Sequence, residues 1–157
     1  MSLSLWEARL GPIDPWQPKQ MTITVKPEID KISLLGLQQI LLAQPQLEFA
    51  VLVGSRASGT ARANSDWDIA LQWSPQLDWL TVLGLTETLR RTLAEALQTD
   101  PSAIDLIELR RANLAMRASV AEEGLPLTGQ DTLAWAHFLQ RTWRDLEDFY
   151  WSKSHAA

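Results

Sequence analysis

The sequence of 157 residues predicts an α/β (α+β) fold in which a small mixed sheet is flanked by helices. Segments with a helical period alternate along the chain with short apolar runs that are rich in strand-forming residues. Clusters of turn-forming residues separate these segments. The length is that of one domain with its own core. Helices that alternate with strands in one such domain indicate a sheet covered by helices.

The N-terminal part divides into an arm and the start of the domain. Residues 1–26 contain three prolines within the first 18 positions and predict an extended arm, with at most a short strand at 21–25. The domain is predicted to occupy residues 27–157. Pro27 suits the first turn of a helix that runs to about Ala43. The residues expected to face the core from this helix are Ile29, Ile32, Leu35, Ile40 and Leu41.

Three apolar runs predict strands, at 47–53 (LEFAVLV), 67–73 (WDIALQW) and 103–109 (AIDLIEL). Between the second and third runs, leucines at 85, 89, 93 and 97 predict a helix that begins near Ser74-Pro75 and ends at Asp100-Pro101. Residues 56–61 are expected to form a short helix.

The remainder of the chain is predicted to be mainly helical. Residues 111–123 have a helical pattern, and 124–128 form a turn or a short edge strand. Thr128 and Asp131 resemble a capping box, so the last helix is predicted from about Asp131 to Lys153. The expected apolar face of that helix carries Trp135, Leu139, Thr142, Leu146 and Phe149 or Tyr150.

Composition restricts the chemistry. The chain has no cysteine and two histidines, so thiolate chemistry and a histidine-rich zinc site are excluded. A bound metal would have to be held by carboxylates, which points to a hard cation such as Mg²⁺. The formal net charge of -5 disfavours binding to phosphate backbones. No apolar run has the length of a membrane span, and no secretory signal is recognisable, so a cytoplasmic protein is expected.

Polar residues stand at the ends of the predicted strands. Gly54-Ser55 follows the first apolar run, where glycine would allow a phosphate to approach the backbone. Asp66 and Asp68 are two positions apart, so they share one face of the second strand. Two carboxylates this close remain ionised when a cation lies beside them, which favours a metal that carries a triphosphate.

A third carboxylate lies on the third apolar run. Alternation places Asp105 with Ile107 and Leu109 on one face and Glu108 on the other, so only one of the two acids can join the site. Asp105 is chosen because it lies deeper in the strand. Three carboxylates could hold two metals, one to activate an attacking hydroxyl and one to hold a departing pyrophosphate.

The segment GSRASGTARANSDWD, Gly-Ser followed after ten residues by Asp-x-Asp, resembles the signature of the DNA-polymerase-β-type nucleotidyltransferase superfamily. The strand IDLIEL and the following RRANLAMRASVAEEGLPL resemble one branch of it, the minimal nucleotidyltransferase (MNT) antitoxins that are paired with HEPN-domain ribonuclease toxins. The resemblance covers roughly residues 28–130. The chain departs from the family pattern in its long arm and in the bulky Trp67.

The resemblance implies a nucleotidyltransferase fold and an antitoxin that transfers AMP from ATP to a tyrosine of a HEPN toxin. It implies a hetero-oligomer with that toxin and a Mg²⁺ site, with two metals expected. The implied catalytic and metal-binding residues are Asp66, Asp68 and Asp105, and the implied nucleotide-binding residues are Gly54, Ser55, Arg56 and Ser65.

Two other functions remain open at this point. The same fold could neutralise a toxin by masking it, with catalysis incidental or lost. It could also act on a small molecule, as aminoglycoside-modifying nucleotidyltransferases do, but the roughly 25 residues after Thr128 provide one helix rather than a substrate domain.

Overall fold

The computed structural model describes residues 31–156 and contains one four-stranded sheet with the strand order β3-β2-β1-β4. Strand β1 is antiparallel to both of its neighbours, whereas β2 and β3 are parallel. The predicted mixed sheet is therefore confirmed. The strands are β1 (Leu47–Val53), β2 (Trp67–Trp73), β3 (Ile104–Glu108) and β4 (Leu125–Thr128).

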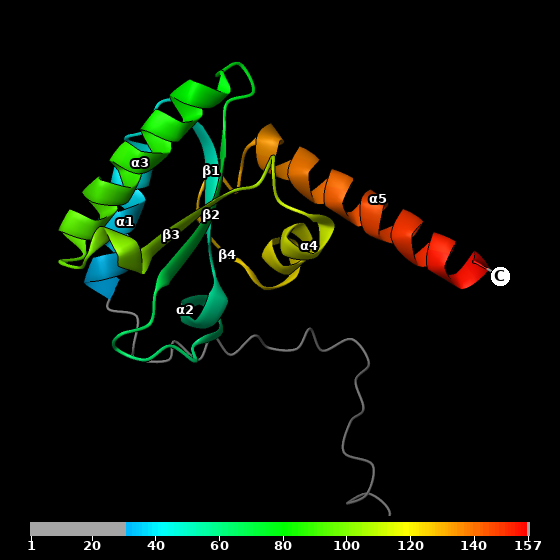
Figure 1. Ribbon diagram of the computed structural model, residues 1–157, viewed down its shortest axis with the longest axis horizontal. Coiled ribbons are helices and arrows are strands. Elements are labelled where there is room, and N and C mark those ends of the chain that lie inside the picture. The colour runs from blue at the N-terminus through cyan, green and yellow to red at the C-terminus, as the bar shows by residue number, and fades with distance from the viewer. Residues whose placement is uncertain (1–30, 157) are drawn as a thin grey trace, which may run out of the picture.

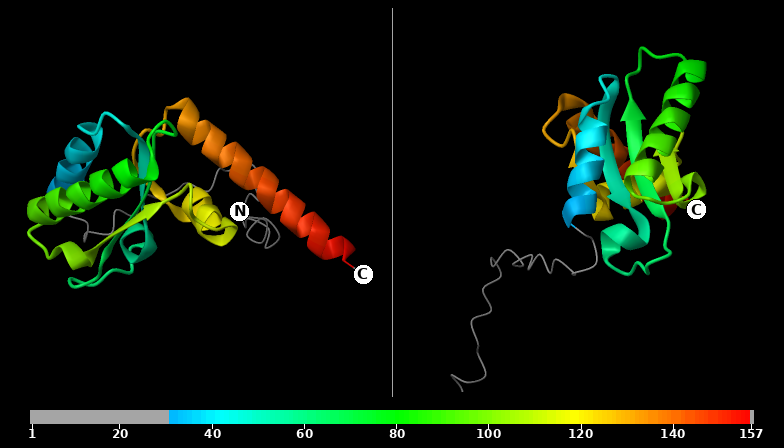
Figure 2. Two further views of the ribbon diagram at one scale, coloured as in Figure 1. Left: turned by 45° about the horizontal axis from the view of Figure 1, so that its top comes forward. Right: turned by 90° about the vertical axis from the view of Figure 1, so that its left-hand side faces the viewer.

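Helices cover both faces of the sheet (Figure 1). Helices α1 (Lys31–Leu42) and α3 (Trp79–Ala96) lie on one face, and α4 (Leu114–Glu123) and α5 (Leu133–His155) lie on the other. The short α2 (Gly54–Ser58) follows β1 directly, and a 3₁₀ turn (Pro101–Ala103) precedes β3. This gives three layers, which the rotated views in Figure 2 also show.

Strand β1 is buried on both faces, which explains its continuous apolar sequence. Ala50 and Leu52 belong to the core beneath α1 and α3, and Phe49, Val51 and Val53 belong to the core beneath α4 and α5. In the second core, the Phe49 ring lies 5.1 Å from Trp135 and 5.4 Å from Phe138. This aromatic group attaches the first turns of α5 to the centre of the sheet.

The predictions for α1 and α3 need correction. Ile32 and Leu35 were expected to be buried but are 78% and 59% exposed, because Leu37 and Leu41 provide the buried side of α1. Helix α3 begins at Trp79 rather than near Ser74-Pro75. The Asp78 carboxylate accepts a hydrogen bond from Thr81 N, and this cap sets the start of the helix. The expected Ile29 and the strand at 21–25 lie outside the described residues.

Helices α4 and α5 also start later than predicted. The Asn113 side chain accepts from Met116 N, so α4 begins at 114 rather than 111. The expected capping box of Thr128 and Asp131 was wrong, because Thr132 caps α5 by accepting from Trp135 N. Residues 125–128 do form the predicted edge strand.

The C-terminal half of α5 extends beyond the sheet (Figure 1). Phe149, which was expected on the buried face, is 51% exposed, and Tyr150 and Trp151 are 63% and 64% exposed. This half of the helix therefore presents an aromatic surface. Among residues 31–156, no helix is both long enough and apolar enough to cross a membrane.

Candidate active site

The strand directions bring three segments of the chain together at one end of the sheet. The antiparallel register pairs Val53, at the end of β1, with Asp68, near the start of β2. The parallel register then pairs Asp68 with Asp105, near the start of β3. The Gly54-Ser55 turn, the Asp66–Asp68 pair and Asp105, far apart in sequence, are therefore neighbours in space.

Gly54 occupies a position that favours glycine over other residues. Its φ is 71°, in the left-handed region. A Cβ atom at this position would also collide with Oδ2 of Asp68. The backbone between β1 and α2 therefore lies directly against a carboxylate, and it leaves no room for a side chain beside it.

The three aspartates interact electrostatically around Asp68. Burial raises the pKa of Asp68 above its ordinary value, and the negative charges of Asp105 and Asp66 raise it further, while Arg56 opposes them. Asp66 and Asp105 are themselves exposed at the surface. The result is a partly buried carboxylate with two exposed ones around it, an arrangement that a cation would relieve.

The carboxylate oxygens suit Mg²⁺, a hard cation that prefers oxygen ligands and retains several waters. Within residues 31–156, no three histidine or acidic side chains are gathered into a group that could hold a metal ion. Asp68 and Asp105 are neighbours through the strand register, but the three aspartate side chains do not form a ready-made ligand cluster. The predicted roles of these three residues remain predictions.

Arg56 has a structural partner within the site. Its Nε and Nη2 donate to the carbonyl oxygen of Ser65 at 3.2 and 2.6 Å, and its guanidinium lies 4.1 Å from the centre of the Trp67 ring. The Oγ of Ser65 accepts from Arg62 N at 2.8 Å. Arg56 therefore ties α2 to the loop that leads into Asp66, an arrangement that the sequence pattern did not predict.

Trp67 and Glu108 are placed outside the carboxylate group. Trp67 is buried in the core beneath α1 and α3, as strand alternation predicts. Glu108 lies towards the opposite end of β3, where its carboxylate accepts from Trp73 N and Arg110 N. Of the two acids on β3, Asp105 is the one beside Asp68.

Comparisons with known proteins agree with this geometry. The nucleotidyltransferase family described as polymerase beta matches residues 36–133. A protein adenylyltransferase MntA from Aphanizomenon flos-aquae is 30% identical over 117 residues, which are 73% of this chain and 75% of the relative. An MntA from Shewanella oneidensis is 35% identical over 85 residues, 54% of this chain and 56% of the relative.

Solved structures give the same result. A toxin–antitoxin with AMP-PNP superposes with a TM-score of 0.60 at 27% identity, covering 77% of this chain and 92% of that chain. A mutant of the toxin–antitoxin MntA–HpeT superposes with a TM-score of 0.58 at 25% identity, covering 80% and 94%. Sequence, strand topology and superposition thus lead to one assignment: the chain belongs to the polymerase beta nucleotidyltransferase family, in its branch of minimal nucleotidyltransferase (MNT) antitoxins.

Proposed function

We propose that this chain is a Mg²⁺-dependent protein adenylyltransferase that transfers AMP from ATP to a tyrosine of a HEPN-domain toxin and thereby inactivates the toxin. The observation that carries the proposal is the register pairing of Asp68 with Asp105, directly beside the glycine turn at Gly54. The names of the two MntA relatives and the AMP-PNP of the superposed toxin–antitoxin support the same activity.

Each residue has a distinct part in the proposed transfer. Gly54 and Ser55 receive the phosphates of ATP, with Arg56 and Ser65 shaping that side of the site. Asp66, Asp68 and Asp105 would hold the metal, and Asp105 would also help to accept the proton of the attacking tyrosine. The tyrosine oxygen bonds to the α-phosphorus, the bond from that phosphorus to the bridging oxygen breaks, and pyrophosphate leaves. Bound Mg²⁺ would neutralise phosphate charge and favour ionisation of the hydroxyl.

The acceptor is proposed to be a protein because the structure carries an exposed surface suited to a protein partner. The C-terminal half of α5 leaves the body of the protein (Figure 1). Its exposed Phe149, Tyr150 and Trp151 are residue types enriched in protein interfaces. A partner that contacts this surface could present its own tyrosine to the carboxylates.

The test is to incubate the chain with Mg²⁺, ATP and the product of its neighbouring gene, the candidate HEPN toxin, then to measure the intact mass of that partner. We expect the mass to rise by one or more AMP units, and Asp66→Ala/Asp68→Ala to abolish the rise. The matched control Glu122→Ala/Glu123→Ala removes two exposed acids from α4 and should leave the rise intact. An inactive toxin in a tight complex without any mass gain would instead establish a masking antitoxin.

A further inference from the structure

A second polar site lies at the end of the sheet opposite the aspartates. A pocket of about 370 Å³ opens there between α5 and the strands. Gln72 lines it from β2, on the same face of that strand as Asp68, because the two are four positions apart. Four residues of a strand span roughly 13 Å, so the pocket and the carboxylates lie along one side of the sheet.

The wall of this pocket that α5 forms is positively charged. Arg141 and Arg144 lie one turn apart on α5, and both are exposed. In the part of the chain that the structure describes, neither has a carboxylate or hydrogen-bond partner. Arg117, which lies nearby on α4, is by contrast paired with Asp145 at 3.0 Å. Two unneutralised guanidinium groups in a chain of net charge -5 indicate a local attraction for anions.

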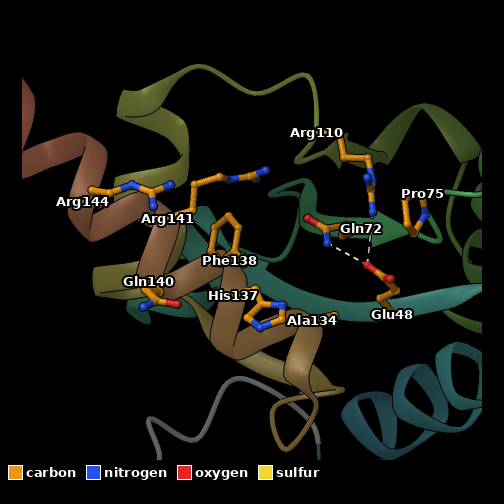
Figure 3. A pocket seen from close by; sticks show the side chains of 10 residues that line it. All are labelled: Glu48, Gln72, Pro75, Arg110, Ala134, His137, Phe138, Gln140, Arg141 and Arg144. Carbon is orange, nitrogen blue, oxygen red and sulfur yellow. Dashed lines mark hydrogen bonds and ion pairs between the residues drawn. The ribbon is translucent and has the colours of Figure 1, made fainter.

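The opposite wall contains a buried acceptor without a donor. Gln72 is only 8% exposed, and its Nε2 donates to Oε2 of Glu48 at 2.7 Å. Glu48 in turn pairs with Arg110 at 3.4 Å. The Oε1 of Gln72 is itself enclosed and has no hydrogen-bond partner among residues 31–156. Figure 3 shows this oxygen turned away from Glu48, towards the part of the pocket into which Arg141 extends.

The two walls together define the ligand chemistry. A ligand needs an anionic group for Arg141 and Arg144, and it needs an N–H or O–H donor for Oε1 of Gln72, because a buried acceptor without a donor is costly. An anion without an O–H or N–H, or a DNA phosphodiester backbone, meets only the first requirement. A polypeptide with an aspartate or glutamate meets both, through its carboxylate and its backbone N–H.

We propose that this pocket is a docking site for an acidic segment of the protein that the chain modifies. The identity of that partner rests on the proposed function. Arg141 and Arg144 bind the acidic side chains, and Gln72 accepts a hydrogen bond from the backbone of the segment. Docking at this distance from Asp68 holds the partner on the enzyme while its acceptor residue reaches the carboxylates.

The first test measures the affinity of the HEPN partner for the full-length chain in an Asp66→Ala/Asp68→Ala background, so that no transfer occurs. Arg141→Gln/Arg144→Gln should raise the Kd about tenfold or more at low salt, with a smaller effect at 0.5 M salt. The control Arg91→Glu lies on α3, across the sheet, and lowers the formal net charge by two, as Arg141→Gln/Arg144→Gln does. It should leave the Kd unchanged.

A second test identifies the docked segment. The chain has no cysteine, so Gln140→Cys, at the edge of the pocket, gives a unique attachment point for a photo-crosslinker. We expect the crosslinked partner peptide to contain aspartate or glutamate, and Glu95→Cys on α3 should not capture it. A captured peptide without acidic residues would contradict the proposal.

The remaining outcomes separate the two proposals. A Kd that does not respond to Arg141→Gln/Arg144→Gln, or the absence of any binding to the partner, overturns the docking site. Inorganic phosphate at millimolar concentration could protect the cysteine of Gln140→Cys from labelling by the crosslinker. That result would make the pocket a small-anion site and would also overturn the proposed docking of an acidic segment. Arg141→Gln/Arg144→Gln could raise the Kd while the chain with its aspartates intact transfers no AMP. That result would contradict the proposed activity and support the docking site.

Discussion

Asp68 on β2 and Asp105 on β3 are register partners in the only parallel strand pair among residues 31–156. Because the two strands run in the same direction, both carboxylates lie near the starting ends of their strands, and both are on the face that carries α4 and α5. The antiparallel β1 ends at the same place and delivers Gly54. The site is thus a consequence of strand direction as much as of residue identity.

The glycine turn gives the first prediction. Gly54→Ala should destabilise the chain by about 1–2 kcal/mol, because it combines a left-handed backbone with a collision against Asp68. It should also reduce AMP transfer at least 100-fold, since displacement of a ligand by about 1 Å is sufficient for such a loss. Chemical unfolding and initial rates of transfer measure the two effects.

Gly84→Ala is the matched control, because a Cβ at this position on α3 would meet nothing within 4 Å. It should leave transfer unchanged and raise the free energy of unfolding by up to about 1 kcal/mol, the helix preference of alanine over glycine. If Gly54→Ala behaved like Gly84→Ala, the glycine turn would not constrain the site.

Arg56 gives the second prediction. Arg56→Lys retains the charge but loses the paired donors to Ser65 O and the flat group over Trp67. We expect a loss of about 1 kcal/mol in stability and a lower transfer rate, because the loop before Asp66 is no longer fixed. If higher concentrations of Mg²⁺ or ATP fully restored the transfer rate of Arg56→Lys, Arg56 would act in ligand binding rather than in fixing the loop.

Much of the fold was predictable because its signals are local. The LEFAVLV run is apolar throughout because β1 is buried on both faces, and the leucines of α3 recur at helical spacing. In each segment the residue pattern alone indicates which side chains are buried. The Gly54 turn directly follows β1, and Asp66 and Asp68 stand at the start of β2, so their placement was foreseeable from the strand pattern. Alternation along β3 similarly separated Asp105 from Glu108.

The helix starts that were predicted too early were decided by local caps, whereas other features depended on contacts between residues distant in sequence. The buried side of α1 is decided by packing against α3 and the sheet, and the apolar Ile32 and Leu35 gave no local indication that they lie outside. The Arg56 side chain donates to the backbone carbonyl of Ser65. Every residue has such a carbonyl, so the residue type at position 65 does not indicate the contact. The unpaired acceptor Oε1 of Gln72 likewise follows only from the folded geometry, so the sequence does not indicate it.

A left-handed residue at the end of α3 gives the third prediction. Gln98 has a φ of 52°, and the following Thr99 N donates to Ala94 O, so Gln98 occupies the position at which helices favour glycine. Gln98→Gly should raise the free energy of unfolding by about 0.5–1 kcal/mol. Gln39→Gly, in the middle of α1, should lower it by a similar amount. Urea unfolding of both variants checks the contrast.

Glu108 gives a pH prediction. Burial raises its pKa above the ordinary value, although hydrogen bonds from Arg110 N and Trp73 N and the charge of Arg110 oppose the shift. A carboxyl whose pKa is higher in the folded state contributes stability that is present at low pH and lost as pH rises through the folded pKa. Relative to Glu108→Gln, the wild type should therefore lose stability as the pH rises above 4.5, the ordinary value, and through the raised pKa of Glu108. A difference between the two proteins that is constant with pH would contradict the burial of this charge.

Thr142 gives the last prediction. It lies on α5, the helix that contributes Arg141 and Arg144 to the proposed docking pocket. Its side chain is fully buried on α5, and its hydroxyl has no hydrogen-bond partner within the described part of the chain, residues 31–156. Thr142→Val keeps the shape and removes the unpaired hydroxyl, so the free energy of unfolding should rise by about 1 kcal/mol. Thr142→Ser keeps the hydroxyl and removes the methyl group, and should lower it by about 1 kcal/mol. Thr142 faces the core, whereas Arg141 and Arg144 face the solvent, so both variants should leave the Kd for the partner unchanged. A change in Kd would mean that altered packing at Thr142 moves α5 as a unit.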